Sequence, residues 1–412
     1  MPLALYAGAT RLIEPLAPRL LQGRAARGKE DPARLGERLG RASAPRPARP
    51  LAWLHGASVG ESLSLLPLIE AIRTHRPDVA ILVTSGTRTS AELLAQRLPE
   101  GVIHQYAPID GPGAVAQFLD HWRPDLAVRV ESELWPNIIG ETRRRGARMA
   151  LLSAKLSDSS HRNWSRLPGS TRALLGAFDL VLAQDARAAE RLRDLGAKVA
   201  GLADLKFGAA PLPADPVALE ALGREVGARP LILAASTHPG EDELMLDAFA
   251  GAEALLVIVP RHPERGPQIA QLAAARSGPV SLRSAGQPIG GADVHVADTL
   301  GELGLWFRLA RLAIIGGGFV SGIGGHNPLE PARLSCPFVS GPHVENWATA
   351  YAELAAAGGG ELIHADQIGA ILRAAVAGDL ALQQRAGRAL AYVEARDAEA
   401  HAALDRVLEL LP

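Results

Sequence analysis

Short apolar runs alternate with segments of helical periodicity along most of the 412-residue chain. The runs at 51–57, 78–85, 125–132 and 254–261 are continuous instead of alternating in polarity. Continuous runs are typical of parallel strands that are covered on both faces. The intervening segments, such as "DARAAERLRDLG", carry apolar residues at helical spacing. The pattern therefore predicts an α/β protein built of doubly wound parallel sheets.

A proline-rich stretch divides this alternation in two. "FGAAPLPADP", residues 207–216, is expected to be a linker between domains. We expect one doubly wound domain at 49–206 and another at 217–385. The stretch 386–412 is helical in pattern and is expected to pack back on the N-terminal domain. Two such domains facing each other form a cleft, and ligands of this fold bind outside the carboxyl ends of the strands.

Charge is concentrated at the start of the chain. The whole protein has a net charge of −1, which argues against a nucleic-acid-coating protein, and its single cysteine fits a reducing compartment. The first 50 residues nevertheless hold ten Lys and Arg against four acids. Charges and prolines interrupt the apolar residues here, so no spanning helix is predicted. Residues 1–48 are either an interfacial helix that touches anionic lipid or a solvated basic face.

Polar residues follow two strand-like runs of the first domain. In "LAWLHGASVGES", Ser58 and Glu61 fit the capping box of a helix, yet a carboxylate at a strand end also suits acid–base chemistry. "ESELWPNI" places Glu131 and Glu133 two residues apart. Both face the same way if the strand continues, and only one faces the cleft if the chain turns after Glu131. The alternative is a surface loop with ordinary acids.

The second domain carries features of a nucleotide site. Glycine-rich turns that lead into helices expose backbone N–H groups to a phosphate, and Arg261 supplies positive charge. Glu330 is placed to accept hydrogen bonds from ribose hydroxyls. The alternatives are tight turns and an acid at a helix N-terminus. His238, His262 and His326 lie on separate loops without metal-ligand spacing, so no metal site is predicted.

At these same positions the chain resembles the 3-deoxy-D-manno-octulosonic acid (Kdo) transferases of lipopolysaccharide synthesis. The resemblance covers nearly the whole chain and rests on long motifs in the family's order: "HGASVGE", "ESELWPN", "SAKLSDSS", "STHPGE", "PRHPER", "GEL" and "GGHNPLEPA…GPHVENW". It implies a GT-B glycosyltransferase, in which two Rossmann-like domains face a cleft. Such an enzyme moves Kdo from CMP-Kdo to a lipid A precursor of the lipid IVA type, with inversion at the sugar carbon.

The resemblance also implies roles for individual residues. Glu61 corresponds to the general base, and Glu131 and Lys206 correspond to residues that stabilise the transition state. The implied contacts of CMP are Pro260, Arg261, Gly301, Glu302, Leu303, Asn327, Pro328, Leu329 and Glu330. No metal and no cofactor beyond the donor substrate are implied.

The expected partners are CMP-Kdo, a lipid A precursor and the cytoplasmic face of the inner membrane, with no nucleic acid. Some positions depart from the family pattern: Ser153, Lys155, Asp204, Gly208 and Gly318 stand where the family more often has Asn, Arg, Asn, Asp and Ser. The alternatives are another GT-B enzyme that uses a UDP-sugar, either a transferase or an epimerase, and an inactive nucleotide-sugar-binding protein.

Overall fold

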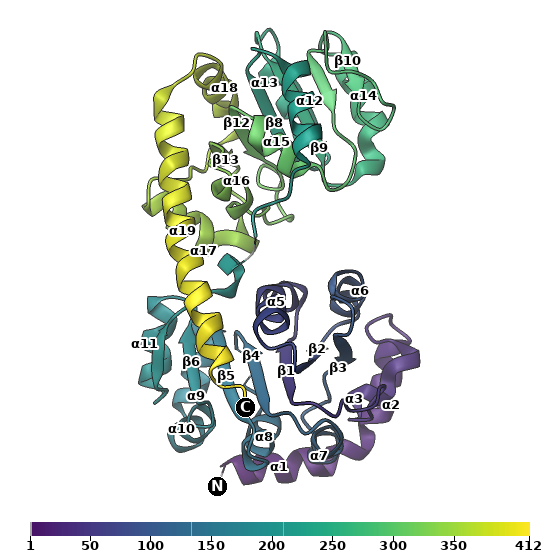
Figure 1. The fold of residues 1–412 in the computed structure, drawn as a ribbon, viewed down its shortest axis with the longest axis vertical. Helices are drawn as coiled ribbons and strands as arrows, with labels where there is room; N and C mark the ends of the chain where they lie inside the picture. The colour runs from purple at the N-terminus through teal and green to yellow at the C-terminus, as the bar shows by residue number, and fades with distance from the viewer. Residues whose placement is uncertain (1, 133, 209) are drawn as a thin grey trace. The chain divides into compact units, whose positions relative to one another are not determined.

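The computed structural model describes residues 2–132, 134–208 and 210–412 (Figure 1). These fall into two compact units, one comprising Met1–Ala209 with Arg396–Pro412 and the other comprising Ala210–Ala395. Each unit is built around one parallel sheet, so the predicted α/β class is confirmed. The cleft between two domains stays a prediction.

The first unit holds a seven-stranded sheet in the order β3-β2-β1-β4-β5-β6-β7. Its strands are β1 Leu51–Gly56, β2 Ala80–Ser85, β3 Ile103–Tyr106, β4 Leu126–Val130, β5 Arg148–Ala154, β6 Leu180–Ala183 and β7 Val199–Leu202. Its helices are α1 Pro2–Ile13, α2 Ala17–Ala25, α3 Leu35–Arg38, α4 Val59–Ser64, α5 Leu66–His75, α6 Arg88–Arg97, α7 Pro112–Trp122, α8 Pro136–Arg144, α9 Asp158–Ser165, α10 Pro168–Leu175 and α11 Ala186–Asp194. Short 3-10 turns η1 Glu14–Leu16, η2 Pro32–Arg34 and η3 Leu205–Gly208 complete it.

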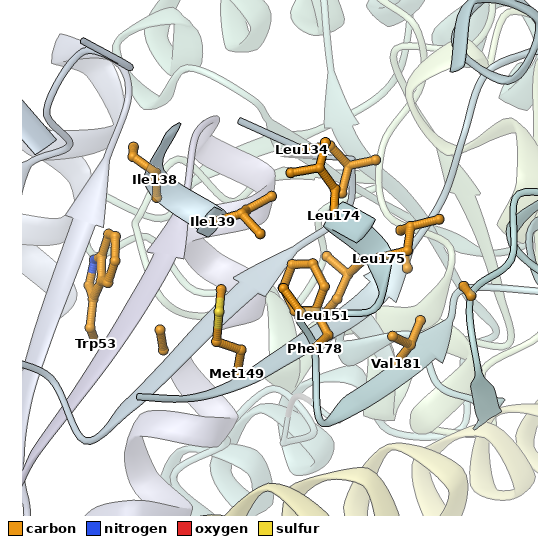
Figure 2. Packing of buried hydrophobic residues seen from close by; sticks show 14 of the residues in the cluster. Trp53, Leu134, Ile138, Ile139, Met149, Leu151, Leu174, Leu175, Phe178 and Val181 are labelled. Atoms are coloured by element: carbon orange, nitrogen blue, oxygen red, sulfur yellow. The ribbon is translucent and has the colours of Figure 1, made fainter. Parts of the chain in front are cut away.

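Both faces of this sheet are buried, as the continuous apolar runs predict. Alternate residues such as Trp53 and Met149 pack with α7, α8 and α10 on one face (Figure 2). The residues between them pack with α5 on the other face. The end of α19 (Leu380–Leu408) joins this second face through Leu404 and Val407. The last helix therefore contributes to the core of the first unit.

The N-terminal segment is folded onto the first unit. The α1–η1–α2 path keeps helical backbone angles across its junctions. Glu14 accepts hydrogen bonds from the backbone N–H groups of Gly113 and Ala114 at 2.9 and 2.6 Å and so caps α7. Further along, the buried Glu30 pairs with Arg24. Acidic side chains thus hold a segment whose sequence shows mainly its positive charge.

The second unit holds a six-stranded parallel sheet in the order β10-β11-β9-β8-β12-β13. Its strands are β8 Leu231–Thr237, β9 Leu255–Pro260, β10 Val280–Leu282, β11 Val294–Val296, β12 Leu312–Ile315 and β13 Phe338–Ser340. Its helices are α12 Pro216–Val226, α13 Glu241–Phe249, α14 Gly266–Ala274, α15 Leu303–Leu309, α16 Leu329–Arg333, α17 Ala348–Ala356 and α18 Ile368–Val376, with 3-10 turns η4 Pro263–Arg265, η5 Glu345–Trp347 and η6 Ala365–Gln367.

The extended segment between the units begins later than the predicted linker at 207–216. Phe207 is buried, and the guanidinium of Arg396 lies 5.1 Å from its ring centroid, so this residue belongs to the first unit. Asp215 accepts a hydrogen bond from the N–H of Val217 at 2.9 Å and caps α12. The irregular chain is therefore shorter than its proline content suggests.

Each sheet has a topological switch point, where neighbouring strands lead to connections on opposite sides. In the first sheet it lies between β1 and β4, and in the second between β8 and β12. Open α/β sheets bind ligands beyond the carboxyl ends of the strands at this point. Glu61 and Glu131 follow the first pair of strands, and His238 and His326 follow the second pair.

Candidate active site

Glu61 lies in the first turn of α4, just after β1, and is 9% exposed. One carboxylate oxygen accepts from the N–H of Ala57 at 2.9 Å, and the other accepts from the Ser58 hydroxyl at 2.8 Å. The Ser58 oxygen in turn accepts from the N–H of Glu61 at 3.3 Å. The Ser58 half of the predicted capping box is therefore present, whereas the Glu61 carboxylate accepts from the N–H of Ala57, one residue before the cap. An ionised carboxylate is an acceptor and can take up a proton.

Glu131 follows β4 directly and turns the chain sharply. Its φ of 60° is in the left-handed region that side chains other than glycine rarely adopt. Its carboxylate lies between two lysines, 2.6 Å from Nζ of Lys155 and 3.3 Å from Nζ of Lys206. The Glu131 side chain is only 12% exposed. Strained backbone of this kind occurs at functional sites, where the surrounding contacts enforce it. Glu133, the other candidate of this motif, lies outside the described residues.

Two of the positions that depart from the family pattern, Ser153 and Asp204, support this lysine–glutamate cluster. The Ser153 hydroxyl accepts from the N–H of Leu205 at 2.9 Å, which ties the end of β5 to η3. Asp204 accepts from the N–H of Lys206 at 3.0 Å and from the amide of Gln184 at 2.8 Å. The substituted residues thus form bonds that position Lys206.

The structure brings the three predicted catalytic residues of the first unit to one edge of its sheet. Glu61 follows β1 and Glu131 follows β4, and these strands are neighbours. The helix that carries Glu61, α4, packs against η3, which carries Lys206. Lys155 joins them as a fourth member. The sequence shows Lys155 only as a departure from a motif, since its pairing with Glu131 depends on the adjacency of β4 and β5.

In the second unit, Pro260 ends β9 and Arg261 follows it at the surface, with its N–H donating to the carbonyl of Thr237 at 3.0 Å. Asn327 donates to Glu330 at 3.3 Å and accepts from the N–H of Leu329 at 3.0 Å. Burial raises the pKa of Glu330, and Asn327, Arg333 and Arg261 act in the opposite direction. Arg261 and Glu330 therefore lie within electrostatic reach of each other.

The Gly301-Glu302-Leu303 segment lies at the same edge, after β11 and at the start of α15. The Glu302 carboxylate is engaged by Arg283, through bonds of 3.0 and 2.7 Å, and by the hydroxyl of Thr299. These bonds, led by that from Arg283, lower the pKa of Glu302. The Glu302 side chain thus anchors the loop. Contact between Glu302 and CMP stays a prediction. The predicted contact of Pro328, which precedes α16, also stays a prediction.

Three histidines accompany Arg261 at this edge. Nε2 of His238 lies 2.9 Å from Nε2 of His326, and the ring of His262 lies 6.0 Å from that of His238. The sequence contains no metal-ligand spacing at these histidines. It also gives no sign that their rings are in contact. Among the described residues no group of three or more His, Cys, Asp or Glu side chains is arranged to hold a metal ion.

A cavity of about 770 Å³ lies at the opposite edge of the first sheet. Pro124 and Asp125, which precede β4, and Arg148, which begins β5, line it with the C-terminal Pro412. No predicted site residue lines this cavity. Its position at the amino ends of the strands separates it from the chemistry described above.

Two doubly wound parallel units in one chain are the architecture of the GT-B fold. Solved structures agree on the fold. A UDP-GlcNAc 2-epimerase from Neisseria meningitidis covers 87% of this chain and 99% of its own at a TM-score of 0.56 and 13% identity. A glycosyltransferase from Rickettsia africae covers 88% and 99% at a TM-score of 0.55 and 11% identity.

Sequence relatives identify the family. Residues 33–209 match the family described as 3-deoxy-D-manno-octulosonic-acid transferase (kdotransferase). The 3-deoxy-D-manno-octulosonic acid transferase of Rickettsia bellii is 35% identical over 324 residues, which are 77% of each chain. The chain belongs to the Kdo transferase family, whose members are glycosyltransferases, and the predicted family and enzyme class are confirmed.

Proposed function

We propose that this protein transfers Kdo from CMP-Kdo to a lipid A precursor, with inversion at the sugar carbon. The observation that carries the proposal is the gathering of Glu61, Glu131, Lys155 and Lys206 at the switch point of the first sheet. Membership of the Kdo transferase family supplies the identity of the sugar.

In the first unit, Glu61 takes the proton of the acceptor hydroxyl. Positive charge develops on the sugar in the transition state, and negative charge develops on the departing phosphate. Fixed charges of the site stabilise both. The cluster of Glu131, Lys155 and Lys206 holds two cations against one anion, and this surplus suits the carboxylate of an acidic sugar. The left-handed backbone at Glu131 fixes the direction of its carboxylate before the substrate binds.

In the second unit, Arg261 and the Asn327–Glu330 loop hold the CMP part of the donor. Arg261 is exposed at the end of β9, where it can pair with phosphate. Glu330 is oriented by Asn327 and accepts hydrogen bonds from the ribose.

The acceptor is a lipid, and the N-terminal segment offers a surface for the inner leaflet of the membrane. Tyr6, Thr10, Glu14, Ala17 and Leu21 recur at helical spacing, and the last two are buried against the unit. A different stripe of the same helical path carries exposed apolar side chains; this N-terminal apolar face comprises Leu5, Leu12, Ile13, Leu16 and Leu20. Exposed arginines and a lysine follow it along the path. Apolar side chains flanked by basic ones bind anionic membrane interfaces.

None of the described helices combines the length and the apolar character needed to cross a bilayer. The proposed attachment at the cytoplasmic face of the inner membrane is peripheral. Leu12→Glu with Leu16→Glu is expected to abolish co-sedimentation with vesicles containing anionic phospholipid. The matched control is Val217→Glu, since Val217 is 75% exposed on α12 of the second unit. Equal sedimentation of both variants would contradict the proposed membrane surface.

The donor is tested by presenting CMP-Kdo, a UDP-hexose and UDP-GlcNAc separately with a lipid A precursor, and by following the nucleotide products by chromatography. We expect acceptor-dependent release of CMP from CMP-Kdo and no turnover of the two UDP-sugars. Epimerisation of UDP-GlcNAc, or UDP release without CMP release, would overturn the proposal. Binding of CMP with no turnover of any donor would also overturn it and would identify a nucleotide-binding protein.

A further inference from the structure

Three neighbouring strands of the second sheet each lead to a histidine. His238 follows β8, His262 follows β9 after Arg261, and His326 lies in the glycine-rich loop after β12. The rings of His238 and His326 are inclined by only 12°, with centroids 5.1 Å apart. At an Nε2–Nε2 distance of 2.9 Å, the ring centroids are farthest apart when both centroids and both Nε2 atoms lie on one line, and the observed separation is close to that limit. The two rings therefore meet end to end in nearly one plane, in the geometry of an N–H···N hydrogen bond.

The surrounding chain is built to hold this pair. Glu241 is fully buried, and its carboxylate accepts from the N–H groups of His238, Gly317 and Phe319 at 3.0, 2.7 and 3.0 Å. It thus joins the ends of β8 and β12. A Cβ on Gly317, whose φ is +73°, would lie 3.0 Å from the ring of His326. The loop therefore needs glycine in order to pass the imidazole so closely.

Positive charge dominates around the pair. Burial lowers the pKa of His238; His262, Arg265 and Arg261 lower it further, whereas Glu241 opposes them. Burial, His238, Arg261 and His262 bring the pKa of His326 to about 4. The adjacent acid Asp242 pairs with Arg265. Both rings are therefore neutral near pH 7 in this environment, and an added anion would reverse the balance and favour an imidazolium.

An end-to-end pair of neutral rings shares one proton across its Nε2 atoms, because two N–H groups cannot point at each other. A second proton on the pair converts this contact into a charge-assisted hydrogen bond between imidazolium and imidazole. Arg261 is within electrostatic reach of both histidines and of Glu330, the acid assigned above to the ribose. The phosphate of a bound nucleotide is the anion that fits this position.

We propose that His238 and His326 take up one proton when a cytidine monophosphate group binds beside Arg261, and that they donate it to the departing phosphate. The inference rests on the proposed function. As the bond between the sugar carbon and the phosphate oxygen breaks, its electron pair goes to the phosphate. The phosphate oxygen receives the proton of the imidazolium, the pair returns to neutral, and CMP leaves as its monoanion. The proton of the acceptor hydroxyl goes separately to Glu61.

Calorimetry of CMP binding to the full chain, in buffers of different ionisation enthalpy near pH 7.5, measures the proton taken up. The wild-type chain is expected to take up about one proton per CMP bound. His238→Gln and His326→Gln are expected to take up clearly less. His75→Gln, on an exposed residue of α5, is the matched control. We expect the two pair variants to lose ~100-fold or more in kcat, with the loss confined to pH values at which the wild-type pair is protonated.

A measurement on the wild-type chain alone covers the case in which the variants fail to fold. In a chain with ¹⁵N-labelled imidazoles, saturating CMP is expected to change the ring nitrogens of two of the twelve histidines toward the imidazolium shift. CMP binding with unchanged proton uptake in the variants, or with no histidine changed toward the imidazolium shift, would overturn the proton role alone. Failure of the wild-type chain to bind CMP at all would overturn the proposed function together with it.

Discussion

Replacing Glu61 by glutamine separates its two roles, because the amide keeps the shape of the side chain and loses its basicity. The amide oxygen can still accept from the N–H of Ala57, which lies 2.9 Å from the carboxylate oxygen in the wild-type chain. The amide nitrogen can donate to the Ser58 oxygen, which reverses the direction of the 2.8 Å bond. What is lost is the negative charge near the start of α4 and the charge-assisted part of these bonds. We expect a cost of about 1 kcal/mol in the free energy of unfolding.

The effect on catalysis is expected to be much larger. Loss of a general base lowers the rate by about 10²–10⁴-fold, which is about 3–5 kcal/mol in the activation free energy. A stability loss of about 1 kcal/mol leaves a domain stable by about 5–15 kcal/mol folded. Reduced folding therefore does not account for such a loss of activity. Ser58→Ala is the matched control, since it removes the cap, costs about 1 kcal/mol and leaves the carboxylate in place.

The assay is the initial rate of CMP release from CMP-Kdo in the presence of the lipid acceptor, with thermal unfolding measured on the same preparations. Glu61→Gln is expected to lower kcat by at least ~100-fold and the melting temperature by about 2–4 °C. Ser58→Ala is expected to lower the melting temperature similarly and to keep kcat within a few-fold. A Glu61→Gln rate close to that of the wild type would refute the base assignment and leave only the cap.

Three further predictions follow from individual side chains. Lys155→Met should lower kcat at least tenfold with little change in melting temperature, because a partly exposed ion pair stabilises a fold by about 1 kcal/mol or less. The control is Lys198→Met, at an exposed lysine. An equal loss of kcat in that control would contradict a specific role of Lys155. Ser335→Gly should raise the melting temperature, since relief of a φ of 50° at an exposed site gains up to about 1 kcal/mol, whereas Ser335→Ala should not. Burial, aided by Arg283, lowers the pKa of His295 to about 4. The unfolded chain therefore binds more protons between pH 6.5 and 4, and stability falls by up to about 3 kcal/mol as the pH drops through this window. His295→Gln should flatten that dependence in urea titrations at pH 5 and 7, and an unchanged slope would contradict it.

The strands of both sheets are predictable wherever they are continuously apolar, because burial on both faces leaves a local signal. The exception is β3, Ile103–Tyr106, which the apolar pattern does not mark. Two of its residues are polar, and Gln105 is nevertheless fully buried because it accepts from the indole N–H of Trp122 at 3.1 Å and donates to the carbonyl of Arg41. Such tertiary partners cannot be read from neighbouring positions.

The same limit applies to the site. Glu61, Glu131 and Lys206 are found in motifs, and their placement at one sheet edge follows from the strand order. The role of Lys155 depends on an ion pair across two strands, and the contact of His238 with His326 depends on loops 88 residues apart in sequence. Pairings of this kind arise from tertiary folding, and no regular spacing of residues along the sequence marks them.

Transfer of Kdo is measured directly by the mass of the lipid after incubation of the wild-type protein with CMP-Kdo and a lipid A precursor. We expect a product heavier by one or more Kdo residues, formed together with an equal amount of CMP, and we expect Glu61→Gln to form none of it. A lipid of unchanged mass, under conditions in which the protein is folded and CMP-Kdo is intact, would contradict the proposed transfer.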